Sequence, residues 1–133
     1  MRYLLDVNLL VAWGWADHTD HERAAKWIAS AKRFRTTFLL TSAIPQLGFV
    51  RVSVQRTAGS LTLSEAAEVL RSMLNSLGRT HLFVPDDISS INWPARCHLA
   101  SQSTDAHLLL LAQAHQAELA TLDTRIPGAF LVP

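Results

Sequence analysis

The feature that most constrains the fold is a set of short, almost uninterrupted apolar runs, each separated from the next by a stretch with helical periodicity. Runs without polar alternation are typical of strands buried on both faces, and strands that alternate with helices are typical of a parallel sheet. We therefore expect an α/β fold, a three-layer α/β/α sandwich with a mostly parallel sheet of four or five strands. The predicted strands are Arg2–Leu5, Thr36–Thr41, His81–Val84, Leu119–Leu122 and, as an optional fifth, Ala129–Val132.

Local start signals predict the helices that connect these strands. Asn8 is expected to cap a short helix that runs through Trp15, and a second helix begins at His21. Ser42 is expected to cap a third helix, which carries Pro45 in its first turn, where proline is tolerated. Each helix thus follows a predicted strand or precedes one, as a parallel sheet requires.

The remaining helix limits follow from capping residues and apolar spacing. The third helix opens at Ala43 and ends near Gly59, a fourth has Ser64 as its N-cap and Gly78 as its stop, and a fifth covers Thr104–Gln116. The side chains expected to point inward from the third and fourth helices are Leu47, Val50, Val54, Ala67, Leu70, Met73, Leu74 and Leu77.

Length and composition narrow the class of protein. The 133 residues, of which 49% are hydrophobic and 17% charged, fit a single domain spanning residues 1–133. The single Cys97 excludes a disulfide scaffold, and a net charge of +1 provides no strong overall field for nucleic acid. No apolar stretch is long enough to cross a membrane, and an acidic residue at position 6 interrupts any signal peptide, so we expect a cytoplasmic protein.

Three aspartates stand where a parallel sheet gathers its functional groups. Asp6 directly follows the first predicted strand, Asp123 follows the fourth, and Asp105 opens a helix. Because the carboxyl ends of parallel strands meet at one edge of the sheet, we expect these three carboxylates to lie together. Their mutual repulsion calls for a compensating charge, and carboxylate oxygens are the ligands that Mg²⁺ and Mn²⁺ prefer. Such a site suits the hydrolysis of phosphodiester bonds.

The segments LLDVNLLVA, TSAIPQLGFVRV, STDAHLLLLAQAH and ELATLDTRI, taken in order, resemble a PIN domain, and more closely the VapC ribonuclease toxins of type II toxin–antitoxin modules. The resemblance covers nearly the whole chain and implies an endoribonuclease that uses Mg²⁺ or Mn²⁺. It implies that Asp6, Asp105 and Asp123 are the first, third and fourth acids of the metal and catalytic site. Asn8 and Thr121 are expected to support that site.

The chain departs from the family at the second acid. The family often has a glutamate directly before a segment like LGFVRV, and this chain has Gln46. A glutamine can hold a metal-bound water or ligate weakly through its carbonyl oxygen, but it adds no negative charge. Either the site works with three aspartates and Gln46 in support, or the chain is a catalytically weak or inactive RNA-binding module of the PIN type.

The resemblance also implies partners. RNA is the expected substrate, and a VapB-like antitoxin is expected to fold a C-terminal segment across the active-site groove. A homodimer is expected, with the helix near Ala43–Val54 as a suitable interface. A small phosphoaspartyl hydrolase is the alternative from another class, but such an enzyme more often has a second aspartate where Asn8 stands.

Other residues allow an RNA contact or a structural role. Arg51 and Arg56 lie on the Gln46 helix and could face phosphate. His18 and His21 stand three residues apart, as a metal site or as part of a turn, and we favour the turn. The tryptophans could stack on bases, although packing in the core is the preferred interpretation; they are Trp13, Trp15, Trp27 and Trp93.

Overall fold

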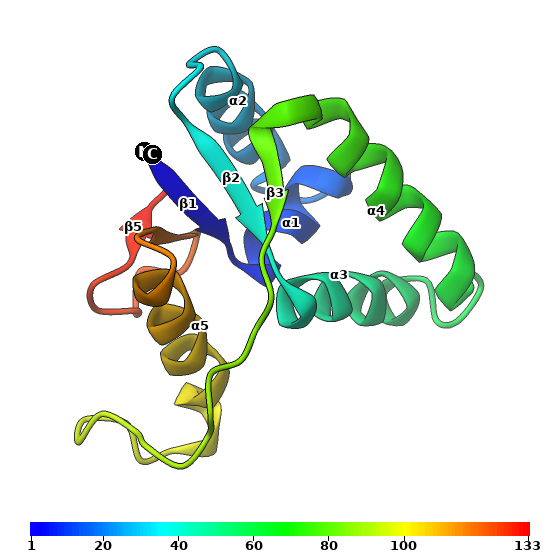
Figure 1. Ribbon diagram of the computed structural model, residues 1–133. Coiled ribbons are helices and arrows are strands. Elements are labelled where there is room, and N and C mark those ends of the chain that lie inside the picture. Colours follow the sequence, from blue (N-terminus) through cyan, green and yellow to red (C-terminus); the bar gives the residue numbers. More distant parts are fainter.

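The computed structural model describes residues 1–133 and contains one five-stranded sheet in which every pair of neighbours is parallel (Figure 1). The strand order is β3-β2-β1-β4-β5, so the first strand lies at the centre of the sheet. Leu4 is in register with Leu40 of β2 and Leu119 of β4. The strands are β1 (Arg2–Leu5), β2 (Phe38–Thr41), β3 (His81–Phe83), β4 (Glu118–Thr121) and β5 (Phe130–Leu131).

Five α-helices connect and cover the strands. They are α1 (Val7–Gly14), α2 (His21–Lys32), α3 (Ala43–Arg56), α4 (Leu63–Leu77) and α5 (Ser103–Ala114). Short 3-10 turns cover Gly78–Thr80 and Ala100–Gln102. No helix is long and apolar enough to span a bilayer.

Two separate hydrophobic clusters confirm the predicted three layers. Alternate strand residues face opposite ways, because side chains in a strand alternate between the two faces. Leu5 and Leu39 belong to a cluster that includes α1, α2, α3 and α4, whereas Leu4, Leu40 and Leu119 belong to a second cluster with α5. Figure 1 shows α5 standing apart from the other four helices, across the sheet from α1 and α2.

Two predicted N-caps were wrong. The first helix begins at Val7, and the cap is Asp6, whose Oδ1 accepts a hydrogen bond from the Val7 backbone N–H at 2.7 Å, rather than Asn8. The fourth helix begins at Leu63 and is capped by Thr62, which forms a reciprocal capping box with Glu65, rather than by Ser64. In both cases an earlier side chain satisfies the free backbone N–H groups, which leaves the predicted residue inside the helix.

The inward face predicted for α3 was wrong at Leu47, whereas Val50 packs against the cluster that includes α1 to α4, as predicted. Leu47 is 62% exposed, whereas the buried residues of this helix are Pro45, Gly48, Phe49 and Ser53. Small residues allow α3 to approach α1 closely. This close contact, and not the positions of the largest apolar residues, determines which face of α3 is buried. On α4 the buried alanine is Ala66, while the predicted Ala67 is exposed.

Other limits differ only slightly from the prediction. Strand β2 begins at Phe38, two residues later than expected. Strand β3 ends at Phe83, one residue before the predicted end at Val84. Strand β4 is displaced by one residue toward the N-terminus. Ser42 occupies the N-cap position of α3, but its buried hydroxyl makes no capping hydrogen bond and has no other partner.

The contact between α1 and α3 yields a stability prediction. A Cβ atom at Gly48 would lie 2.6 Å from a methyl carbon of Val7. An exposed helical glycine gains about 1 kcal/mol on replacement by alanine, but overpacking costs about 1–3 kcal/mol. We expect Gly48→Ala to lower the urea unfolding midpoint, and Val7→Ala in the same chain to restore much of the loss. A stabilised Gly48→Ala single variant would contradict this packing.

Candidate active site

Asp6 joins the central strand to the first helix. It follows β1 directly, caps α1, and is only 4% exposed. One carboxylate oxygen accepts from the Val7 backbone, and the other accepts a 2.7 Å hydrogen bond from the Thr121 hydroxyl at the end of β4. The two strands that meet at the centre of the sheet are thereby joined at their carboxyl ends.

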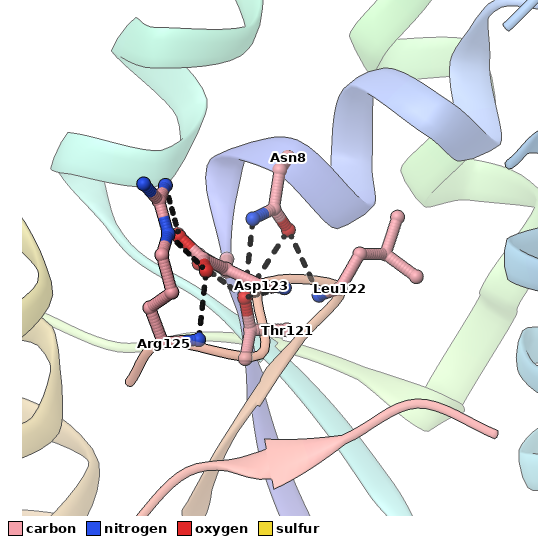
Figure 2. Close-up of polar contacts among 6 residues, drawn as sticks. Asn8, Thr121, Leu122, Asp123 and Arg125 are labelled. Atoms are coloured by element: carbon pink, nitrogen blue, oxygen red, sulfur yellow. Dashed lines mark hydrogen bonds and ion pairs between the residues drawn. The ribbon is translucent and has the colours of Figure 1, made fainter. Parts of the chain in front are cut away.

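Asn8 and Thr121 organise the turn after β4, as Figure 2 shows. The Asn8 side-chain amide donates to Thr121 Oγ1 at 3.1 Å, and its carbonyl oxygen accepts from the Leu122 backbone N–H at 3.2 Å. The Asp123 backbone N–H also donates to Thr121 Oγ1, at 3.1 Å. The structure therefore places Asn8 and Thr121 beside the predicted acids, and their hydrogen bonds fix Asp6 and Asp123 relative to each other.

Asp123 is held by an arginine that the sequence analysis did not single out. The Arg125 guanidinium donates from Nε and Nη2 to the two oxygens of Asp123, at 3.0 and 3.1 Å, and the Arg125 backbone N–H donates to Oδ1 at 2.9 Å (Figure 2). These hydrogen bonds hold the pKa of Asp123 below its ordinary value. The only sequence signal was the two-residue spacing between an acid and a base in a turn.

Asp105 lies in the first turn of α5 and is partly exposed. Burial raises its pKa, the negative charges of Asp6 and Asp123 raise it further, and Arg125 acts in the opposite direction. Charges interact in this way only when they lie close together, since exposed charges are largely screened beyond about 10 Å. The three predicted acids therefore stand near enough to one another, at the carboxyl edge of the sheet, for their charges to interact.

Burial also raises the pKa of Asp6, and the charge of Asp123 adds to this shift. The hydrogen bonds from Thr121 and Val7 favour the ionised form and offset part of it. The ionised Asp6 is thus a destabilising group that the fold tolerates. Perturbed carboxylates gathered at the end of a parallel sheet are typical of a functional site.

The donor chemistry of this site fits a hard divalent cation. Three carboxylates offer oxygen ligands, and a cation would offset the burial and the repulsion that together raise the pKa values of Asp6 and Asp105. However, no three His, Cys, Asp or Glu side chains lie close enough together to hold a metal ion as they stand. Asp123 in particular is engaged by Arg125.

Gln46 forms its side-chain hydrogen bond away from the three acids. Its Nε2 donates to Thr41 Oγ1 at 3.0 Å, and the same hydroxyl lies 2.6 Å from Nε2 of His81. Burial lowers the pKa of His81. The structure therefore ties Gln46 to the ends of β2 and β3, and no hydrogen bond connects it with Asp6, Asp105 or Asp123.

The basic residues predicted to contact RNA differ in their surroundings. Arg56 donates to Asp17 at 2.9 Å and lies over the Trp15 ring, 5.0 Å from its centroid, so both its charge and its plane are engaged. Arg51 is exposed on α3. For both residues an RNA contact stays a prediction.

The favoured structural interpretations of the histidines and of three tryptophans agree with the structure. His18 Nδ1 accepts from the Asp20 backbone, and His21 Nδ1 lies 2.9 Å from the Ala12 carbonyl, so both stabilise the turn before α2. Trp13, Trp15 and Trp27 pack against the larger core cluster. The exception is Trp93, which is 42% exposed.

Comparison with known proteins agrees with the fold. Residues 3–129 match the PIN domain family. Ribonuclease VapC44 of Mycobacterium tuberculosis is 37% identical over 97% of this chain and 94% of its own length. Ribonuclease VapC39 of the same organism is 33% identical over 95% of this chain and 91% of its own length. Ribonuclease VapC38 is 34% identical over 92% of this chain and 86% of its own length.

The chain therefore belongs to the PIN domain family. Within that family it is of the VapC type, because the matches to these relatives extend along nearly their entire length.

The raised pKa of Asp6 yields a pH prediction. The folded state binds the Asp6 proton more tightly than the unfolded state, so this group lowers stability progressively as the pH rises through its folded pKa. We expect Asp6→Asn, measured without metal, to melt at a higher temperature than the wild type at about pH 7, with little difference at about pH 3. Asn can still cap α1.

The matched control is Asp87→Asn, an exposed carboxylate in the loop after β3. It should leave the melting temperature nearly unchanged at both pH values. A gain for Asp6→Asn that is the same at both pH values would contradict the assignment to Asp6 ionisation.

Proposed function

We propose that this protein is an endoribonuclease toxin that hydrolyses RNA phosphodiester bonds at the edge formed by Asp6, Asp105 and Asp123, with Mg²⁺ or Mn²⁺ as its cofactor. The observation that carries the proposal is that Asp6, Asp105 and Asp123 stand near enough for their negative charges to interact, in a chain of the VapC type. The printed names of the relatives, all ribonucleases, support the substrate class. A cytoplasmic setting, as the sequence analysis expects, suits a protein that acts on cellular RNA.

The bound ion and the three aspartates would have separate roles in the reaction. A bound ion supplies positive charge that shields the phosphate from the carboxylates and activates water. The carboxylate oxygens that would hold this ion are those of Asp6, Asp105 and Asp123. The hydrogen bond from Thr121 fixes the position of the Asp6 carboxylate.

We further propose a VapB-like antitoxin and a second copy of the chain as partners. A hollow of about 640 Å³ lies between α3, α4 and β3 and is lined mainly by apolar side chains, among them the exposed Leu47 and Phe83. Exposed apolar surface of this kind is typical of a protein interface. It supports the predicted dimer contact through the helix near Ala43–Val54.

Gln46 supports a second candidate function, a weak or inactive RNA-binding module. Its Nε2 is engaged by Thr41, and its neutral amide lacks the negative charge of the second acid that is often found in the family. In this case the protein would bind RNA at the same edge and cleave it poorly or not at all.

The decisive experiment compares the wild type with Asp6→Asn for cleavage of total RNA and for the thermal shift caused by Mg²⁺. Stabilisation by a ligand follows RT ln(1 + [L]/Kd), so a weakened site gives a smaller shift. We expect Asp6→Asn to abolish cleavage and to lose most of the Mg²⁺-dependent shift. An Asp6→Asn variant that retains both RNA cleavage and the full Mg²⁺-dependent shift would contradict the metal-nuclease proposal. A wild type that binds RNA without cutting it would favour the second candidate.

Substitution of Gln46 tests whether this position contributes to the metal site. We expect Gln46→Glu to tighten Mn²⁺ binding, because it adds a charged oxygen donor at the position of the second acid. The measurement is a calorimetric Mn²⁺ titration, with Gln55→Glu on the exposed end of the same helix as the control for added charge. Equal affinity in the wild type and Gln46→Glu would place residue 46 outside the metal site.

A further inference from the structure

The segment between β3 and α5 is long and irregular, yet it is fixed at both ends. Near its start, Asp86 Oδ2 lies 2.6 Å from Nε2 of the buried His107 on α5. Near its end, the backbone N–H groups of His98 and Leu99 both donate to Gln102 Oε1, at 3.1 and 3.0 Å. Figure 1 shows this segment projecting beyond the N-terminal end of α5. We call residues 85–99 the β3–α5 loop.

Trp93 lies on the surface of this loop, where a hydrogen bond restrains its indole ring. Its indole Nε1 donates to the Ser90 carbonyl at 2.9 Å, while 42% of the residue stays exposed. A hollow of about 260 Å³ lies beside it, with Cys97, His98, Leu99 and Ser103 among its lining residues. A restrained aromatic plane next to an open hollow suits the stacking of an unpaired base.

The surface beside Trp93 continues to the acids and carries two arginines. Cys97, which lines the hollow, also lines a small crevice together with Arg96, Asp105 and Arg125. The Arg125 side chain is 86% exposed and uses Nε and Nη2 on Asp123, so its Nη1 group is free to donate to a further anion. Two cations next to three carboxylates can offset the repulsion between those carboxylates and a phosphate.

We propose that Trp93, Arg96 and Arg125 form the substrate-binding surface for single-stranded RNA, a proposal that rests on the proposed function. Trp93 stacks on an unpaired base, and Arg96 and Arg125 contact phosphates on the same side of the cleavage site. RNA is favoured over a protein partner because the surface combines an aromatic plane with guanidinium groups and is continuous with the proposed catalytic edge. Stacking on Trp93 requires a base outside a duplex, so paired RNA binds poorly.

The test measures binding without cleavage. A short fluorescein-labelled single-stranded RNA of mixed sequence is titrated with the full-length Asp6→Asn protein, and Kd is read from fluorescence anisotropy. We expect Trp93→Ala added to this chain to weaken binding by about 5- to 100-fold, and Trp93→Phe to recover most of it. Arg125→Gln should weaken binding and reduce the slope of log K against log salt by about one, and Arg125→Lys should retain that slope.

Matched controls carry the same changes at the opposite edge of the sheet. Arg33→Gln and Phe34→Ala remove an exposed cation and an exposed aromatic ring from the segment before β2. Both should leave Kd within about twofold of the parent, and melting curves confirm that every variant folds.

Any one of several outcomes in the RNA titrations would overturn the inference. They are an unchanged Kd in Trp93→Ala and Arg125→Gln, an equal loss in the controls, and equal affinity for duplex and single-stranded RNA. If these variants instead weaken only self-association or binding of a protein partner, the surface is a protein interface and the inference is wrong. Failure of the wild type to cleave RNA, with selective loss of binding in these variants, would refute the proposed nuclease activity alone.

Discussion

The hydrogen bond from the Thr121 hydroxyl to the buried Asp6 carboxylate is the interaction on which the rest of the site depends. It joins the carboxyl ends of β1 and β4 and brings the turn that carries Asp123 over the N-terminus of α1. The same carboxylate caps α1, so the start of that helix and the geometry of the acids are set by one side chain. A neutral residue at position 6 could cap the helix, but it would not supply the charge around which the site is arranged.

The sequence predicted the architecture well because the fold depends on patterns that are local. Short apolar runs and helical spacing predict strands and helices from neighbouring residues, and a parallel sheet then brings its strand ends to one edge. Asp6 and Asp123 directly follow such strands and Asp105 begins a helix, so all three were predictable at that edge. The family resemblance added Asn8, and the structure supports its position through contacts with residues more than 100 positions away in the chain.

What the sequence could not predict depends on contacts between distant side chains. Leu47 has the spacing of a core residue, but the close approach of Gly48 to Val7 turns another face of α3 inward. Asn8 is a good capping residue, but Asp6 is two residues closer to the strand and takes that role. Arg125 was missed because its importance comes from a bidentate contact with Asp123, which spacing alone does not indicate.

The strand order β3-β2-β1-β4-β5 also governs when the site can form during synthesis. The central strand is made first, but its neighbour β4 is the second-last strand in the chain, and Thr121 and Asp123 come with it. Domains emerge from the ribosome N-terminus first, and pairing between strands so distant in sequence is slow. The nascent chain therefore carries Asp6 without these partners until β4 has been made, and the acidic edge assembles only after that strand has left the ribosome.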